Sequence, residues 1–166
     1  AIAGLGGVGG VHLLTLARLG VGAFNIADFD RFELHNFNRQ AGATLPNLDR
    51  PKLDAMAEAA LAINPELELR RFPDGVTDDN LDAFLDGVDL YVDALDFFAL
   101  PARRKVFAAA YARGIPAITA ACPGVATMPS GSTPGRNRVI CSPSSPGNWN
   151  SSKIISAPWK AATCAC

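Results

Sequence analysis

The feature that most constrains this chain is a glycine-rich stretch near its start, Gly4-Leu5-Gly6-Gly7-Val8-Gly9, which follows a short apolar segment. Gly4, Gly6 and Gly9 satisfy the G-x-G-x-x-G spacing expected between a strand and a helix. Glycines permit a tight turn there, and the N–H groups and partial positive charge of the helix start favour a phosphate. Alone, this spacing indicates either a nucleotide site or merely a tight strand-to-helix turn.

Strand and helix signals alternate from this loop to Ala121. We expect strands at residues 1–3, 23–27, 67–72, 88–92 and 115–120, and helices at 7–19, 51–63, about 77–85 and 100–113. Repeated units of this kind predict an α/β, Rossmann-like fold, with a mostly parallel sheet, helices on both faces, and both ends incomplete. We expect Val8, Val11, Leu14 and Ala17 to face the sheet, and Thr77 or Asp78 to cap the short helix.

Composition changes abruptly after Ala121. Residues 1–121 contain every Asp, Glu, Leu and Phe, whereas residues 122–166 contain all four Cys, both Trp and half of the Pro. We therefore expect a partial nucleotide-binding domain at 1–121 and an irregular tail at 122–166. The tail is interpreted either as a flexible Ser/Pro-rich extension or as an out-of-frame translation from near Cys122. Its cysteines lack paired C-x-x-C spacing, so we expect no zinc.

The composition and the overall charge are those of an ordinary globular protein. The formal net charge is −1, which gives no argument for binding nucleic acid or an anionic membrane. No apolar run approaches the roughly 18 residues that a membrane span requires, and the start does not resemble a secretory signal. We expect a cytoplasmic protein without a membrane partner.

Polar residues follow the second expected strand. Asp28 lies about 20 residues beyond the glycine loop, where a carboxylate can accept hydrogen bonds from a ribose. An NAD(P)-dependent oxidoreductase would share both features. Arg39 and Lys52 favour ATP instead, because cleavage between the α and β phosphates requires neutralisation of negative charge. The alternative is that Arg39 and Lys52 are ordinary solvated surface residues.

Two acidic residues follow the fourth expected strand. Asp96 is a candidate Mg²⁺ ligand, since Mg²⁺ prefers one or two carboxylates together with phosphate oxygens. Alternatively, Asp96 caps the next helix. Asp93 is a candidate for either role.

These blocks together resemble a known family. The order Gly-Leu-Gly-Gly-Val-Gly, Asp-Phe-Asp, Asn-x-x-Arg-Gln, Pro-Lys and a strand ending in Asp is similar to the E1-like superfamily, over about residues 1–121. That superfamily includes the ThiF, MoeB and HesA proteins and the ubiquitin-activating enzymes. The resemblance implies ATP- and Mg²⁺-dependent adenylation of a carboxylate, the C-terminal glycine of a ubiquitin-like or sulfur-carrier protein. It also implies a homodimer when the protein is full length.

The resemblance assigns roles residue by residue. Asp96 becomes the metal-associated acid, and Arg39, Lys52 and Asp96 the residues that act in adenylation. The residues expected to bind the nucleotide are Gly4, Gly6, Gly7, Gly9, Asp28, Asp30, Asn36, Arg39, Gln40 and Lys52.

The chain also departs from the family pattern. Phe97 and Phe98 follow Asp96, where the family usually has Asn, which indicates a HesA/ThiF-like subgroup. No cysteine in residues 1–121 is available for a thioester step. The substrate remains open between a ubiquitin-like protein, a peptide and a modified tRNA base. An inactive nucleotide-binding scaffold and an NAD(P)-binding oxidoreductase remain alternatives, and we expect weak or no activity from this chain alone.

Overall fold

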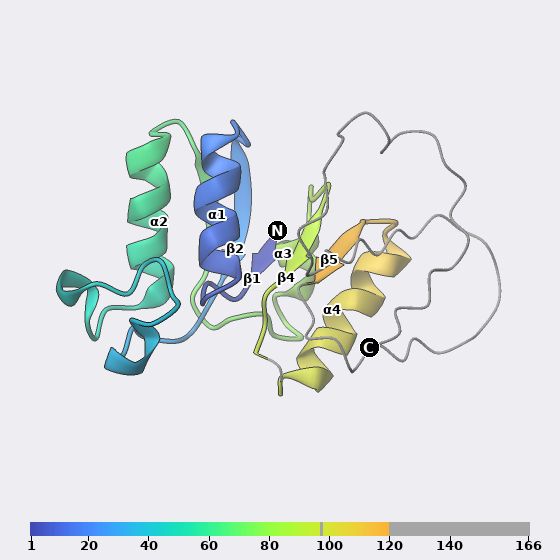
Figure 1. Ribbon diagram of the computed structural model, residues 1–166. Coiled ribbons are helices and arrows are strands. Elements are labelled where there is room, and N and C mark those ends of the chain that lie inside the picture. The colour runs from blue at the N-terminus through green and yellow to red at the C-terminus, as the bar shows by residue number, and fades with distance from the viewer. Residues whose placement is uncertain (97, 120–166) are drawn as a thin grey trace, which may run out of the picture.

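A computed structural model describes residues 1–96 and 98–119 of the chain (Figure 1). Its strands are β1 (Ile2–Ala3), β2 (Ala23–Ala27), β3 (Glu68–Phe72), β4 (Tyr91–Asp93) and β5 (Ala117–Thr119). Its helices are α1 (Gly9–Arg18), α2 (Lys52–Ile63), α3 (Leu81–Leu85) and α4 (Leu100–Ala112), with short 3-10 turns η1 (Leu34–Asn36) and η2 (Leu45–Asn47). The expected tail, residues 122–166, lies outside the described residues.

The strands form one parallel sheet in the order β3-β2-β1-β4-β5. The chain moves outward from β1 to β3 and then returns to the other side of β1 to form β4, so the order reverses between β1 and β4. Open α/β sheets bind their ligands beyond the carboxyl ends of the strands at such a reversal. The predicted α/β, Rossmann-like fold is thus confirmed. Its topology predicts a ligand site at the carboxyl ends of β1 and β4, where the strand order reverses.

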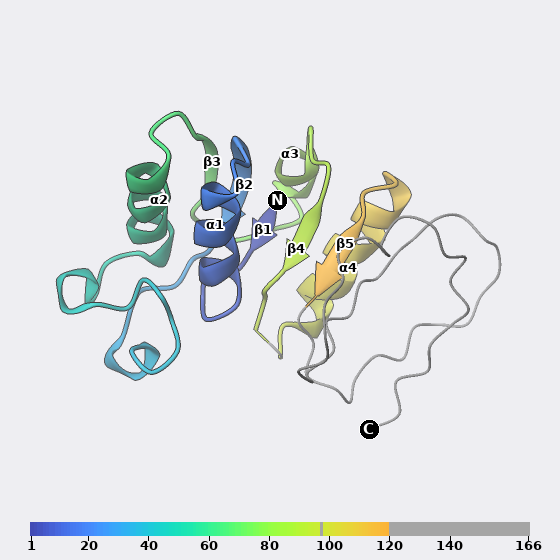
Figure 2. The same cartoon turned by 45° about the horizontal axis from the view of Figure 1, so that its top comes forward.

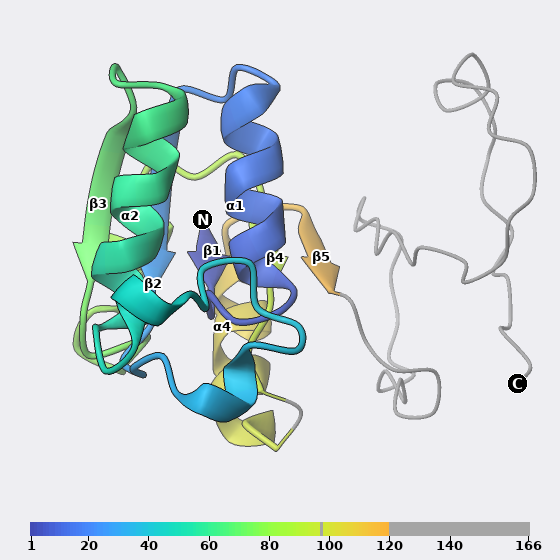
Figure 3. The same ribbon diagram turned by 60° about the vertical axis from the view of Figure 1, so that its left-hand side comes forward.

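Side chains of β1, β2 and β4 alternate between two hydrophobic cores. Ile2, Ile26 and Val92 join the core formed with α1 and α2, whereas Ala27 and Tyr91 join the core formed with α3 and α4. Figure 2 shows α1 and α2 on one side of the strands and α4 on the other, and Figure 3 shows α1 and α2 in front of the sheet. The prediction of helices on both faces is confirmed.

The buried face of α1 differs from the expected one. Val8 and Val11 are 36% and 46% exposed, whereas Leu13 is fully buried. The reason is the contact with α2: a Cβ added at Gly10 would lie 3.3 Å from Cε of Met56. The glycine therefore faces the neighbouring helix, and this close approach turns the valines outward. The expectation that Val8 and Val11 face the sheet was wrong.

The start of α3 also differs from the prediction. The helix begins at Leu81 rather than after Thr77 or Asp78. Asn80 accepts a hydrogen bond from the backbone N–H of Thr77 at 2.8 Å and donates one to the carbonyl of Gly75 at 2.8 Å. The amide thereby closes the loop before the helix. No helix among residues 1–96 and 98–119 has the length and apolar character needed to cross a bilayer.

Candidate functional site

The glycine loop joins β1 to α1 at the point where the strand order reverses. Gly4 has a φ of +87°, and a Cβ there would lie 2.4 Å from the carbonyl oxygen of Ala94. A Cβ at Gly9 would lie 2.9 Å from Cβ of Ala94 and still closer to the carbonyl of Gly4. Both positions therefore require glycine. The same contacts bring the loop directly against the segment between β4 and α4.

Asp28, which follows β2, fixes the shape of the glycine loop. Its Oδ2 accepts a hydrogen bond from the backbone N–H of Leu5 at 2.6 Å, and its Oδ1 accepts one from Asp30 N–H at 2.8 Å. Burial raises the pKa of the Asp28 carboxyl, and the two backbone hydrogen bonds and the charge of Lys52 oppose that shift. Each carboxylate oxygen retains a second lone pair, so Asp28 can still accept a ribose hydroxyl.

Gln40 lies against the glycine loop from the segment between β2 and α2. Its side chain is buried, with the amide nitrogen 3.5 Å from the position that a Cβ of Gly6 would take. Its Oε1 is buried without a hydrogen-bond partner among the described residues. An unsatisfied buried acceptor costs about 1–3 kcal/mol. The Gln40 amide lies directly against Gly6 of the glycine loop.

Asn36 and Arg39 belong to the same segment but differ in surroundings. Asn36 is 2% exposed, and its Oδ1 accepts a hydrogen bond from the backbone N–H of Glu33 at 2.9 Å. Asn36 therefore shapes the turn. The stem of Arg39 lies over the loop, with Cγ 3.5 Å from the position of a Gly7 Cβ, while its guanidinium is exposed and donates to the carbonyl of His35 at 3.1 Å.

Lys52, the first residue of α2, is held by Asp30. Its Nζ lies 2.9 Å from Oδ2 of Asp30, and its backbone N–H donates to the Asp30 carbonyl at 2.9 Å. Because Asp30 follows Asp28 at the end of β2, this pair lies next to the carboxylate that binds the glycine loop. Asp30 thus orients a cation, a relation that the sequence analysis did not anticipate.

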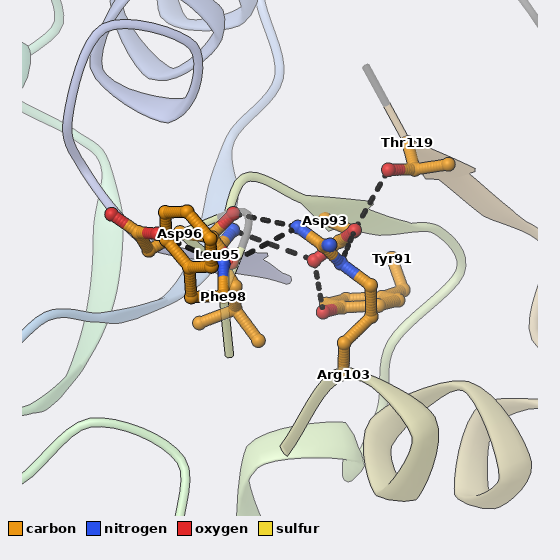
Figure 4. A network of polar contacts seen from close by, with 7 residues as sticks. All are labelled: Tyr91, Asp93, Leu95, Asp96, Phe98, Arg103 and Thr119. Carbon is orange, nitrogen blue, oxygen red and sulfur yellow. Dashed lines mark hydrogen bonds and ion pairs between the residues drawn. The ribbon is translucent and has the colours of Figure 1, made fainter. Parts of the chain in front are cut away.

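Asp93 and Asp96 have opposite environments (Figure 4). The Asp93 side chain is 0% exposed, and both of its oxygens accept hydrogen bonds, Oδ2 from Arg103 and Thr119 at 2.7 Å each. Asp93 is therefore occupied as a structural anchor and is not available to share a metal. Asp96 is exposed, and its Oδ1 accepts the backbone N–H of Phe98 at 3.0 Å.

Within the described residues, the group that could hold Mg²⁺ is the exposed carboxylate of Asp96, and no fuller protein-derived metal site is found there. Residues 1–96 and 98–119 contain no cluster of three or more His, Cys, Asp or Glu that could hold a metal ion. Mg²⁺ does not need one, because it is commonly bound by one or two carboxylates with phosphate oxygens and water. An exposed carboxylate such as that of Asp96 matches the protein part of that donor set.

Several of the predicted residues are thus brought together around the glycine loop, whereas Lys52 is linked to it through Asp30, and Asn36 bonds Glu33 instead. Direct contacts join the glycine loop to Asp28, Gln40 and Arg39 on one side and to the segment that carries Asp96 on the other. Sequence reasoning missed Arg103. The sequence does place Arg103 early in a helix that follows Asp93 and Asp96. An arginine in such a position is too common to predict a role.

Comparison with known proteins gives the family context. The profile of the ThiF family matches residues 1–152, which extends beyond the domain boundary expected at residue 121. The tRNA threonylcarbamoyladenosine dehydratase of Bacillus subtilis is 38% identical over 97 residues, 58% of this chain and 38% of that protein. The sulfur carrier protein ThiS adenylyltransferase of Escherichia coli is 34% identical over 123 residues, 74% of this chain and 48% of that protein.

Solved structures agree with this result. The structure of the Escherichia coli tRNA N6-threonylcarbamoyladenosine dehydratase in complex with ATP has a TM-score of 0.69 and 32% sequence identity. The alignment covers 78% of this chain and 53% of that one. The chain therefore spans about half, or less, of the length of these relatives.

Proposed function

The chain belongs to the ThiF family, and on that premise we propose that it uses ATP to adenylate a carboxylate. The observation that carries the proposal is the contact between Gly4 and Ala94, which puts a phosphate-type loop beside the segment that bears Asp96. Relatives support the same chemistry, because one is named as an adenylyltransferase and another has been solved with ATP.

The proposed reaction joins a carboxylate to the α-phosphate. A substrate carboxylate oxygen attacks the α-phosphorus, the bond between that phosphorus and the bridging oxygen to the β-phosphate breaks, and pyrophosphate leaves with the bonding electrons. An acyl-adenylate remains. The protein contributes mainly by holding the reactants in line and by neutralising charge that develops on the leaving pyrophosphate.

Each candidate residue has a defined part in this proposal. The glycine loop and the start of α1 face the phosphates, and Asp28 accepts a ribose hydroxyl. Arg39 and Lys52 supply positive charge, and Gln40 contributes its amide, which lies beside Gly6 of the glycine loop. Asp96 would hold Mg²⁺ together with phosphate oxygens, and the ion would add to charge neutralisation.

We propose two alternative substrates that would supply the carboxylate. The first is the C-terminal glycine of a ubiquitin-like or sulfur-carrier protein, by analogy with the relative named for the sulfur carrier ThiS. The second is a carboxylate on a modified tRNA base, by analogy with the relatives named for threonylcarbamoyladenosine in tRNA. Stimulation of pyrophosphate release by a carrier protein or by tRNA distinguishes the two.

ATP–pyrophosphate exchange by the complete protein tests the proposal. We expect Asp96→Ala to lower exchange by about 10²-fold or more, the loss typical for removal of a group that stabilises charge in the transition state. The exposed Asp79 provides a control, since Asp79→Ala should leave exchange unchanged. Unchanged exchange in Asp96→Ala would refute the role of Asp96.

Assays of the wild-type protein distinguish adenylation from an inactive scaffold and from an oxidoreductase. Bound ATP without exchange, in the presence of both carrier protein and tRNA, would identify an inactive nucleotide-binding scaffold. Displacement of ATP by NADH at lower concentration would instead indicate an oxidoreductase.

A further inference from the structure

Arg103 turns back from α4 toward the segment that carries Asp96 (Figure 4). Its Nε donates to Oδ2 of Asp93 at 2.7 Å, and its Nη2 donates to the carbonyl of Leu95 at 2.7 Å. The same Nη2 lies 3.4 Å from the carbonyl of Asp96. One guanidinium thus bridges the Asp93 side chain at the end of β4 and the backbone carbonyls of Leu95 and Asp96.

The partner of Arg103 is itself fixed. Besides the contacts of Oδ2, Oδ1 of Asp93 accepts the Tyr91 hydroxyl at 3.3 Å and the backbone N–H of Leu95 at 3.4 Å. Burial, followed by the negative charge of Asp93, raises the pKa of Tyr91, so its hydroxyl stays protonated as a donor. Thr119 connects the same carboxylate to β5. Asp93 is therefore a rigid point from which Arg103 can position other groups.

The glycine loop contacts the segment of residues 94–96 on the side opposite Arg103. Ala94 lies against Gly4 and Gly9, so closely that neither glycine has room for a Cβ. The backbone of residues 94–96 is consequently held between the glycine loop and the guanidinium. Displacement of this backbone would move the Asp96 carboxylate relative to the phosphates.

We propose that Arg103 is a positioning residue that sets the place of Asp96 through the carbonyls of Leu95 and Asp96. This inference rests on the proposed adenylation, in which Asp96 holds a divalent cation with ATP. A guanidinium is needed because its planar fork bonds a carboxylate and a carbonyl at the same time, whereas a lysine ammonium is a single point of charge. Arg103 itself touches neither nucleotide nor substrate in this account.

Arg103→Lys in the complete protein is the test, because lysine keeps the positive charge near Asp93 but not the fork. Arg104→Lys is the matched control, since Arg104 is its exposed neighbour on α4. We expect ATP affinity without metal and the thermal unfolding temperature to stay close to wild type. Binding of Mn²⁺ to the complex with a non-hydrolysable ATP analogue, measured by electron paramagnetic resonance, should weaken about 10-fold or more, as is typical for residues that orient a metal ligand.

Exchange kinetics give a second measurement. We expect Arg103→Lys to lower kcat for pyrophosphate exchange and to leave KM for ATP unchanged, while Arg104→Lys matches the wild type. Unchanged Mn²⁺ affinity in Arg103→Lys would overturn the inference. An equal loss of ATP affinity and thermal stability would also overturn it, because Arg103 would then serve only the fold.

Two further outcomes keep the test decisive. If Arg103→Lys fails to fold, Thr119→Val removes one donor from Asp93 and should still weaken Mn²⁺ binding, and unchanged binding there overturns the inference. If the wild-type protein shows no exchange with any carboxylate, the proposed function fails and this inference fails with it. Normal wild-type exchange with an unaffected Arg103→Lys refutes the positioning role alone.

Discussion

Nζ of Lys52 lies 2.9 Å from Oδ2 of Asp30, and the two side chains are exposed to 7% and 52%. The cation is therefore enclosed at the start of α2, while its acidic partner still faces solvent. In this arrangement Asp30 holds the ammonium beside Asp28 and the glycine loop. The ion pair therefore holds the ammonium of the long, flexible Lys52 side chain in one position.

The first prediction concerns this pair. Lys52→Met keeps the length of the side chain but removes the charge, and we expect it to lower ATP–pyrophosphate exchange by about 10²-fold or more. Asp30→Asn keeps a hydrogen-bond acceptor for the ammonium. It should lower exchange by only about fivefold, since a charge-assisted hydrogen bond exceeds a neutral one by about 1 kcal/mol. A greater loss in Asp30→Asn than in Lys52→Met would contradict this order.

The second prediction uses the unpaired Oε1 of Gln40. Gln40→Met has similar volume and no polar atom to leave unsatisfied, so we expect the free energy of unfolding to rise by about 1 kcal/mol. Nucleotide affinity should fall, because the amide that faces Gly6 is lost. Urea unfolding and calorimetric titration with ATP check the two effects. A variant that loses stability and keeps its affinity would show that Gln40 serves the fold.

Much of the fold could be predicted because its signals are local. Glycine at Gly4, Gly20 and Gly114, each with a positive φ, stands at a turn between a strand and a helix, and apolar runs mark the buried strands between them. Acidic residues that follow the strands lie at one edge of the sheet, as expected, because parallel strands end on the same side. The strand β2, Ala23–Ala27, matched its expected bounds.

What could not be predicted depends on contacts between distant segments. Gly10 looks like any helix residue until Met56 of α2 is placed against it, and that contact decides which face of α1 is buried. The resemblance singled out Asp96, but the sequence did not show what binds the Asp93 side chain. Arg103 and Thr119, 10 and 26 residues beyond Asp93, bind its carboxylate and leave Asp96 as the exposed acid of the two.

The third prediction compares two glycines. Gly9→Ala would place its methyl group against the carbonyl of Gly4 and 2.9 Å from Cβ of Ala94, so the glycine loop must shift. We expect nucleotide binding to be lost and thermal stability to fall. Gly22→Ala is the control, because no atom lies within 4 Å of its added Cβ. That variant should bind ATP like the wild type, and equal losses in both variants would argue against a specific role for the loop.

The fourth prediction follows from the raised pKa of Asp28. A carboxyl whose pKa is higher in the folded state than its ordinary value of 3.8 binds its proton more tightly when folded. Its contribution to stability is therefore fully present below pH 3.8 and is lost as the pH rises through the folded-state pKa. Asp28→Asn does not titrate at this position. Accordingly, the free energy of unfolding of the wild type, minus that of Asp28→Asn, should decrease as the pH rises from about 4 toward neutrality.

Urea unfolding of both proteins across this pH range measures the difference, and a carbon-13 NMR titration of the Asp28 carboxyl measures its pKa directly. The direction in which this stability difference changes with pH is informative, because two effects on the pKa of Asp28 oppose each other. Burial favours the neutral acid, whereas the N–H groups of Leu5 and Asp30 and the charge of Lys52 favour the carboxylate. A stability difference that increases with pH would mean that these donors outweigh burial. Asp28 would then stabilise the glycine loop through its charge, and its pKa would lie below the ordinary value.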